Sequence, residues 1–179
     1  ILAQDFSGKT DRPGAAWQVI PGLGRTGDAV AVFPTTAPSV ELAHVARAAP
    51  SLRYDLYLSR AGEATVHYNL IPTQPLVDGT GLRFAVALDD GPPELVTIKA
   101  GTGDESVVSR AWQENVLDNT TTATTRHNFA TAGAHTLKIY MVDAGVALEK
   151  IVVDLGGLQP SYLGPPQTSV PAKEEGQGG

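Results

Sequence analysis

The feature that most constrains the fold of this chain is a pair of long strand patterns near its C-terminal end. Ahead of the turn-forming residues 143–145, the apolar residues Leu137, Ile139 and Met141 occupy every second position, and polar or aromatic residues lie between them. Successive side chains of a strand point to opposite faces, so this period of two predicts a strand with one buried face. Residues 148–155 contain three β-branched residues in a row, which is typical of a strand deep in a packed sheet. This region therefore predicts two long strands joined by a short connection.

The same alternation recurs along the rest of the chain. Residues 53–58 and 64–70 alternate most clearly, and the turn residues between them predict a hairpin with an apolar inner face and a polar outer face. One short helix is predicted over residues 39–49, closed by Pro50. Further strands are expected at residues 1–6, 17–20, 29–33, 82–88, 95–98 and 120–129, with a loop at 7–14. The patterns predict roughly nine to eleven strands and no internal repeat.

Length and composition indicate one domain followed by a tail. The chain has 179 residues, of which 42% are hydrophobic, enough to fill a single core. Nineteen glycines and thirteen prolines, with few helical patterns, favour many short strands and turns. We therefore predict an all-β fold, an antiparallel β-sandwich of jelly-roll type, over residues 1–164, and a flexible tail or linker over residues 165–179.

Charge and cysteine content exclude several classes of partner. The net charge is -6 and the isoelectric point is about 5.1, which argues against binding to nucleic acid or to an anionic membrane surface. The absence of cysteine excludes a disulfide framework and a thiolate metal site. No apolar run approaches the roughly 20 residues that span a bilayer, and the first residues lack the pattern of a signal peptide. We expect an excised or processed segment whose export signal lies outside it, with a neutral partner.

Catalytic motifs are missing from the sequence. Asp89 and Asp90 are adjacent, so a role in the turn DDGPP is favoured over a pair of catalytic carboxylates. The histidines, at positions 44, 67, 127 and 135, lack the spacing of a metal or catalytic motif. A free-standing esterase or hydrolase has no nucleophile motif to support it. We therefore expect the chain to be non-catalytic.

Carbohydrate binding requires an aromatic face for the sugar ring and a few fixed polar groups for its hydroxyls. Trp112 lies in a polar segment with Asn119 and Arg126 close behind it, although a tryptophan that covers the end of the core fits the pattern equally well. Trp17 is predicted to be a core residue.

The outer face of the predicted hairpin is a second candidate for a sugar site. Tyr57, His67 and Asn69 fall on its polar positions and would line an open groove for an extended chain. A solvated sheet face is the simpler interpretation of the same pattern.

Four stretches of the sequence resemble a known family. WQVIPGLGRTGDAV, DDGPP, WQENVLDN and AGAHTLKIYMVDAGVALEKIVVDLGGLQPSYLGPP resemble the C-terminal β-sandwich domain of glycoside hydrolase family 115 α-glucuronidases, over nearly the whole chain apart from the tail. Those enzymes remove glucuronic acid or its 4-O-methyl ether from xylan, with catalytic residues in earlier domains. The resemblance implies a non-catalytic module for xylan or glucuronoxylan, upstream catalytic domains as partners, and a secreted or periplasmic location. The alternative is a structural or dimerisation domain that binds no sugar.

A more distant resemblance concerns the two ends of the domain. ILAQDFSG is similar to the IEAEDYSG-type opening of carbohydrate-binding module families 6 and 35, and GVALEKIVV is similar to their GxNIDxIxV close. This resemblance implies a galactose-binding-domain-like jelly roll, a sugar site at the loop end that includes Trp112, and a structural Ca²⁺ held by Gln4 and Glu149. The sequence departs from the pattern at Leu2 and Gln4, which replace acidic residues, and at Ala147, where asparagine is common. Calcium prefers six to eight oxygen ligands, several of them carboxylates.

Overall fold

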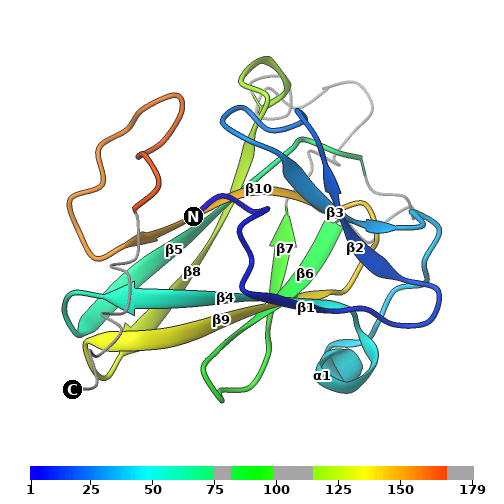
Figure 1. Ribbon diagram of the computed structural model, residues 1–179, viewed down its shortest axis with the longest axis horizontal. Coiled ribbons are helices and arrows are strands. Elements are labelled where there is room, and N and C mark those ends of the chain that lie inside the picture. The colour runs from blue at the N-terminus through cyan, green and yellow to red at the C-terminus, as the bar shows by residue number, and fades with distance from the viewer. Residues whose placement is uncertain (75–81, 99–114, 169–179) are drawn as a thin grey trace, which may run out of the picture.

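The computed structural model describes residues 1–74, 82–98 and 115–168, and these residues form two antiparallel sheets of five strands each, packed face to face (Figure 1). Sheet 1 contains, in spatial order, β1 (Gly8–Thr10), β4 (Ser51–Leu58), β9 (Gly133–Met141), β6 (Leu82–Leu88) and β7 (Glu94–Ile98). Sheet 2 contains β2 (Ala16–Ile20), β3 (Ala29–Phe33), β10 (Ala147–Asp154), β5 (Gly62–Leu70) and β8 (Thr121–Phe129). The predicted jelly-roll sandwich is confirmed.

Alternating side chains of the two sheets form one core. Leu137, Ile139 and Met141 of β9 are at most 2% exposed and point toward sheet 2. Tyr68 of β5 meets Phe84 of β6 edge to face across the sandwich, with ring centroids 5.2 Å apart. Burying each large apolar side chain contributes about 1.5–3 kcal/mol to folding. The period-two pattern therefore identified the buried positions correctly.

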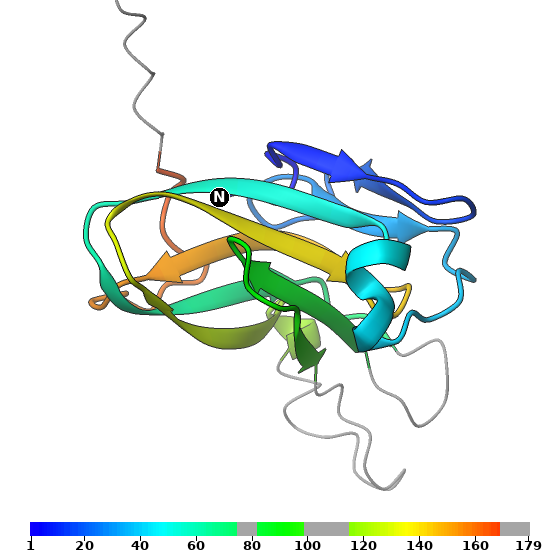
Figure 2. The same cartoon turned by 90° about the horizontal axis from the view of Figure 1, so that it is seen from below.

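The predicted hairpin of residues 53–70 is wrong, because its two strands belong to different sheets. β4 pairs with β1 and β9, whereas β5 pairs with β10 and β8. Figure 2 shows β4 and β5 in separate layers of the sandwich. The short turn between them crosses from one sheet to the other, so both strands bury their apolar face in the same core while their polar faces point in opposite directions. Tyr57 consequently lies on the outside of sheet 1, and His67 and Asn69 lie on the outside of sheet 2.

The N-terminal segment connects the two sheets. Ile1 and Ile151 of β10 exchange two backbone hydrogen bonds of 2.9 Å each, and Leu2 forms an isolated bridge with Lys150. The chain then turns, with the Asp5 N–H donating to the Leu2 carbonyl at 3.1 Å, and enters sheet 1 as β1. The N-terminal residues therefore lie directly beside the last strand. The expected strand at 1–6 and loop at 7–14 are wrong, since the turn interrupts the first and β1 occupies part of the second.

Three smaller predictions are confirmed. The helix predicted over residues 39–49 consists of η1 (Leu42–His44) and α1 (Val45–Ala48). Trp17 is 2% exposed and belongs to the core. β10 lies in the middle of its sheet, between β3 and β5.

Within the described residues, no helix is long and apolar enough to cross a membrane. The predicted tail at 165–179 falls mostly outside the described part of the chain.

Candidate functional site

Three of the predicted binding residues lie together on the outer face of sheet 2. Val66 and Tyr68 of β5 are fully buried in the core. His67 and Asn69 alternate with them along the strand and therefore point to the outer face. Arg126 of β8 pairs with Thr65, which shares that parity, and paired residues of neighbouring strands lie on the same face. The structure therefore unites residues that the sequence had divided between two candidate sites.

A C-terminal segment, residues 155–165, turns this face into a groove. It leaves the end of β10, loops outward and returns, as the orange and red ribbon of Figure 1 shows. Lys150 Nζ donates to the Leu163 carbonyl at 2.7 Å, and Arg60 donates to the Leu155 carbonyl. These contacts hold both ends of the segment against the body of the sandwich.

The resulting groove, here called the sheet 2 groove, consists of two hollows of about 390 and 410 Å³ that share Asp154. The first is bounded by the strand residues His67, Asn69 and Thr122 and by the C-terminal segment. The second contains Arg126. Ligand pockets of proteins commonly have volumes of about 300–1,000 Å³, so each hollow is large enough for a small ligand.

The polar groups of the groove include both hydrogen-bond donors and acceptors. Thr122 Oγ1 donates to Asn69 Oδ1 at 3.2 Å, and Asn69 is only 9% exposed, so the orientation of its amide is fixed. Imidazole, hydroxyl and carboxylate groups from His67, Thr122 and Asp154 lie along the same hollow. An oriented amide with an imidazole and a carboxylate beside it can bind the hydroxyls of a polar, uncharged ligand.

A chain of polar side chains runs from the second hollow into the core. His127 Nε2 lies 2.7 Å from Thr125 Oγ1, which lies 3.0 Å from the Tyr68 hydroxyl. Burial lowers the pKa of His127 and raises that of Tyr68, so both side chains are neutral near pH 7. This chain satisfies buried polar groups behind the groove and keeps β8 in register with β5.

An aromatic residue that the sequence analysis missed also lines the groove. Tyr162 lies on the C-terminal segment, at the first hollow, and is 60% exposed. It follows the last strand in a stretch rich in proline and glycine, where no periodic pattern marks its surroundings. The available signal was a single aromatic residue in an otherwise irregular segment.

The two residues implied as calcium ligands are occupied by protein contacts. Glu149 is 1% exposed, and its carboxylate accepts from the backbone N–H of Arg25 at 2.7 Å and from Arg25 Nε at 3.3 Å. Gln4 Oε1 accepts from the Asp28 N–H at 2.7 Å. A calcium ion requires several free oxygen ligands, and a guanidinium already neutralises the only carboxylate here. This donor set does not fit calcium unless Arg25 moves away, so calcium binding stays a prediction.

The loop of residues 21–28 packs closely against the side chains of Gln4 and Glu149. A Cβ added at Gly24 would lie 2.6 Å from the Gly27 carbonyl oxygen and 3.0 Å from Glu149 Cγ. A Cβ at Gly27 would lie 2.9 Å from Gln4 Oε1. Glycine at both positions allows the backbone to cover the ends of Gln4 and Glu149. In the described residues no group of three or more His, Asp or Glu side chains is arranged to hold a metal ion.

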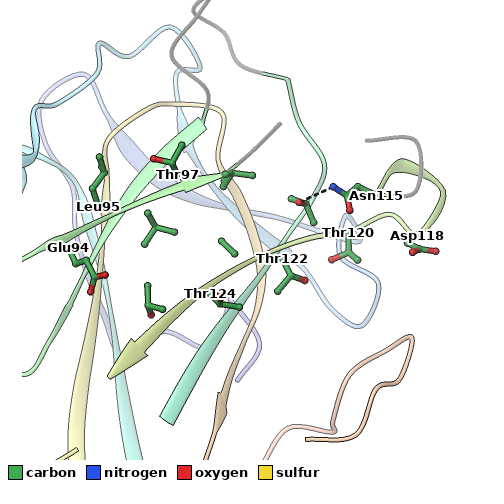
Figure 3. A pocket seen from close by; sticks show the side chains of 13 residues that line it. Glu94, Leu95, Thr97, Asn115, Asp118, Thr120, Thr122 and Thr124 are labelled. Atoms are coloured by element: carbon green, nitrogen blue, oxygen red, sulfur yellow. Dashed lines mark hydrogen bonds between the residues drawn. The ribbon is translucent and has the colours of Figure 1, made fainter. Parts of the chain in front are cut away.

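A cleft of about 670 Å³ opens between β7 and β8 at the edge of the sandwich (Figure 3). Asn115 Nδ2 donates to Thr121 Oγ1 at 3.2 Å at one end of this cleft, and Asp118 lies nearby. Thr120 and Thr122 line both this edge cleft and the first hollow of the sheet 2 groove. The cleft and the groove therefore meet at the start of β8. The Thr120 hydroxyl is buried without a partner in the described structure.

The predicted loop-end site is not assembled as expected from its described members. Asn119 sits in a turn with a positive φ of 50°, just before β8. Arg126 is the sixth residue of β8, so at about 3.3 Å per residue it lies roughly 15 Å or more away. Trp112, the aromatic residue predicted for this site, lies outside the described residues.

Tyr57 lies apart from the other candidates. It is 63% exposed on the outer face of sheet 1 and lines a hollow of about 550 Å³ between β4 and β10. Tyr57 therefore belongs to the outer face of sheet 1, whereas His67 and Asn69 lie on the outer face of sheet 2. The hollow beside Tyr57 nevertheless shares Asp154 and Leu158 with the sheet 2 groove.

Comparisons with known proteins agree with the fold. The model of a family described as the glycosyl hydrolase family 115 C-terminal domain matches residues 1–167. The chain is 23% identical to a solved family GH115 4-O-methyl-α-glucuronidase with specificity for decorated arabinogalactans; the match covers 83% of this chain and 17% of that one, with a TM-score of 0.57. No curated protein matches the sequence.

Two solved carbohydrate-binding modules share the fold over almost their whole length. A family 35 module from Clostridium thermocellum is 16% identical, with a TM-score of 0.53, and the match covers 86% of this chain and 96% of that one. A module from the Cellvibrio mixtus lichenase 5A, solved in complex with cellotriose, is 16% identical, with a TM-score of 0.51 and coverage of 88% and 96%. At this identity the likeness concerns the sandwich fold. The distant resemblance to module families 6 and 35 is thereby confirmed as a shared fold.

Proposed function

Since this chain belongs to the glycosyl hydrolase family 115 C-terminal domain family, we propose that it is the non-catalytic carbohydrate-binding module of an α-glucuronidase and that its ligand is xylan or glucuronoxylan. The observation that carries this proposal is the sheet 2 groove. It gathers His67, Asn69 and Thr122 along a hollow of about 390 Å³, and a hydrogen bond joins Asn69 to Thr122. These side chains supply the hydrogen-bond donors and acceptors that sugar hydroxyls require.

The acidic balance of the chain is consistent with a neutral polysaccharide. At a net charge of -6, a strongly anionic polymer would be repelled unless a basic patch received it. Xylan has an uncharged backbone, and the sparse uronate side groups of glucuronoxylan add little charge per sugar. Arg126, in the second hollow, is a guanidinium that a uronate carboxylate could pair with.

The proposal places the domain in a larger, exported enzyme. The chain spans 17% of the length of the related GH115 structure. We propose that upstream domains carry the catalytic residues, that the module holds the polysaccharide near them, and that the parent enzyme is secreted or periplasmic.

A binding experiment with the isolated domain tests this function. Isothermal titration with xylohexaose, glucuronoxylan and a decorated arabinogalactan should give saturable binding to at least one of the two xylan ligands. Asn69→Ala should weaken that binding about tenfold or more, because a buried, oriented amide is lost from the site. Arg53→Ala, on the opposite face of the sandwich, serves as the matched control and should bind normally.

Three outcomes would contradict the proposal. Absence of binding to all three polysaccharides would indicate that the domain does not recognise glycans, and binding to arabinogalactan alone would contradict the xylan assignment. Release of glucuronic acid by the isolated domain, above a heat-inactivated control, would contradict its non-catalytic role.

A structural role is the alternative, and the hollow beside Tyr57 favours it. Exposed Tyr57 and the apolar residues Leu155 and Leu158 line this hollow between β4 and β10, where a neighbouring domain or subunit would bury them. Light scattering tests this role: a dimer that Tyr57→Ser dissociates would support it, and a monomer at all concentrations would not.

A further inference from the structure

We propose that Tyr162 is the stacking platform of the sheet 2 groove and that it receives the apolar face of an uncharged pyranose ring. The proposal rests on the carbohydrate-binding function proposed above and adds the residue and the sugar class. It concerns a residue outside the strands, on a segment that folds back over the sheet. Neither the loop-end site with Trp112 nor the predicted hairpin face included this residue.

Arg25 and Lys150 hold Tyr162 in place. The guanidinium carbon of Arg25 lies 5.3 Å from the ring centroid, in cation–π geometry, and Arg25 Nη1 donates to the Tyr162 carbonyl oxygen at 2.6 Å. Lys150 Nζ fixes the next carbonyl, that of Leu163, at 2.7 Å. Two cations therefore hold the consecutive carbonyls of Tyr162 and Leu163, although the Tyr162 ring itself is 60% exposed.

The anchor for Tyr162 is itself rigid. Arg25 pairs with Glu149, and their side chains are only 9% and 1% exposed. Glu149 belongs to β10 in the middle of sheet 2. Arg25 therefore connects Tyr162 to a central strand of the sandwich. An exposed aromatic ring held by buried contacts loses little conformational entropy when a ligand arrives, and this favours binding.

The opposite side of the hollow supplies the polar contacts. His67 and Asn69 lie on the sheet, and Asp154 lies at the junction with the second hollow. A pyranose presents C–H groups on its ring faces and hydroxyls around its rim, so one face can stack on Tyr162 while the rim bonds to the sheet. The carboxylate of Asp154 can accept hydrogen bonds from the hydroxyls of an uncharged sugar such as xylose.

The test compares two exposed tyrosines on opposite faces. Tyr162→Ala should lower affinity for xylohexaose at least tenfold, since loss of a central aromatic anchor commonly has that effect or a larger one. Tyr162→Phe should retain affinity within about threefold, because the ring and not the hydroxyl makes the stack. Tyr57→Ala is the matched control, with 63% exposure against 60% for Tyr162, and should bind as the wild type does.

The outcomes separate this proposal from the proposed function. Normal binding by Tyr162→Ala, while the wild type binds xylohexaose, would overturn the platform and leave the carbohydrate-binding function intact. A loss with Tyr57→Ala instead would place the site on sheet 1. Failure of the wild type to bind any of the three polysaccharides would overturn both proposals. Melting curves of the three variants should match that of the wild type, which confirms that a lost affinity is not lost folding.

Discussion

Replacement of Arg25 by alanine should destabilise the domain by about 3 kcal/mol. The change leaves the carboxylate of Glu149 buried at 1% exposure without its guanidinium, and breaking a buried ion pair in this way costs about 3–5 kcal/mol. The Arg25 backbone N–H still donates to Glu149 Oε1 at 2.7 Å in the variant, which favours the lower end of that range. For a domain of this size the expected loss corresponds to a Tm lower by roughly 6–12 °C.

The assay is urea unfolding followed by tryptophan fluorescence, with Trp17 in the core as one reporter. Arg53→Ala is the control, because its pair with Asp55 at 3.5 Å has side chains 53% and 60% exposed and should contribute less than about 1 kcal/mol. The double variant Arg25→Ala with Glu149→Gln should recover part of the loss, since it removes the unpaired charge. A loss for Arg25→Ala no larger than that for Arg53→Ala would refute the reasoning.

The Tm of the wild type after calcium chelation tests the same ion pair. If Arg25 supplies the positive charge at Glu149, exhaustive chelation should leave the Tm of the wild type unchanged. A ligand that binds only the folded form at 100 times its dissociation constant adds about 2.7 kcal/mol, so a bound calcium would be visible as a higher Tm. A Tm that falls on chelation and returns with Ca²⁺ would establish the metal site at Gln4 and Glu149 that the resemblance implies.

Three further predictions concern other parts of the chain. The hydrogen bond to Asp89 at 2.8 Å raises the pKa of His135 against the effect of burial, so the stabilisation by this pair is fully present below the usual histidine value of 6.5 and is lost as the pH rises through the folded pKa. His135→Gln should therefore lower the free energy of unfolding at pH 6 by on the order of 1 kcal/mol, and this loss should shrink by pH 9, whereas exposed His44→Gln should have no effect at either pH. Trp112→Ala should weaken xylohexaose binding about tenfold at unchanged Tm if the loop-end prediction is right, and a variant that unfolds would return Trp112 to the core. Trp17→Ala should cost roughly 3–5 kcal/mol in urea unfolding, and a loss below 1 kcal/mol would contradict its place in the core.

The sequence contained enough to predict the sandwich and most of its buried positions. Alternation is a local property, so Leu137, Ile139 and Val66 could be assigned to a core without knowledge of strand partners. Pairing depends on how each connection turns, and the three residues between β4 and β5 would serve equally well for a hairpin and for a crossing between sheets. That ambiguity is why Tyr57 was placed beside His67 when the two lie on opposite faces.

The groove could be predicted only in part. His67, Asn69 and Arg126 were identified as polar residues at outward positions, but their common face follows from the order of β10, β5 and β8, which no single stretch encodes. Arg25 and Glu149 are 124 positions apart, so their pairing is invisible in a local pattern. Tyr162 lies in an irregular segment whose path depends on contacts with those same distant residues.

The most direct test of the central claim is an NMR titration of the ¹⁵N-labelled domain with xylohexaose. The account predicts saturable chemical-shift changes concentrated on the sheet 2 groove, at His67, Asn69 and Thr122 on the strands and at Tyr162 on the C-terminal segment. Amides of β4 around Tyr57, on the other face, should not shift. Saturable changes confined to that face, or no changes at any sugar concentration, would contradict the claim that this domain binds glycans through the sheet 2 groove.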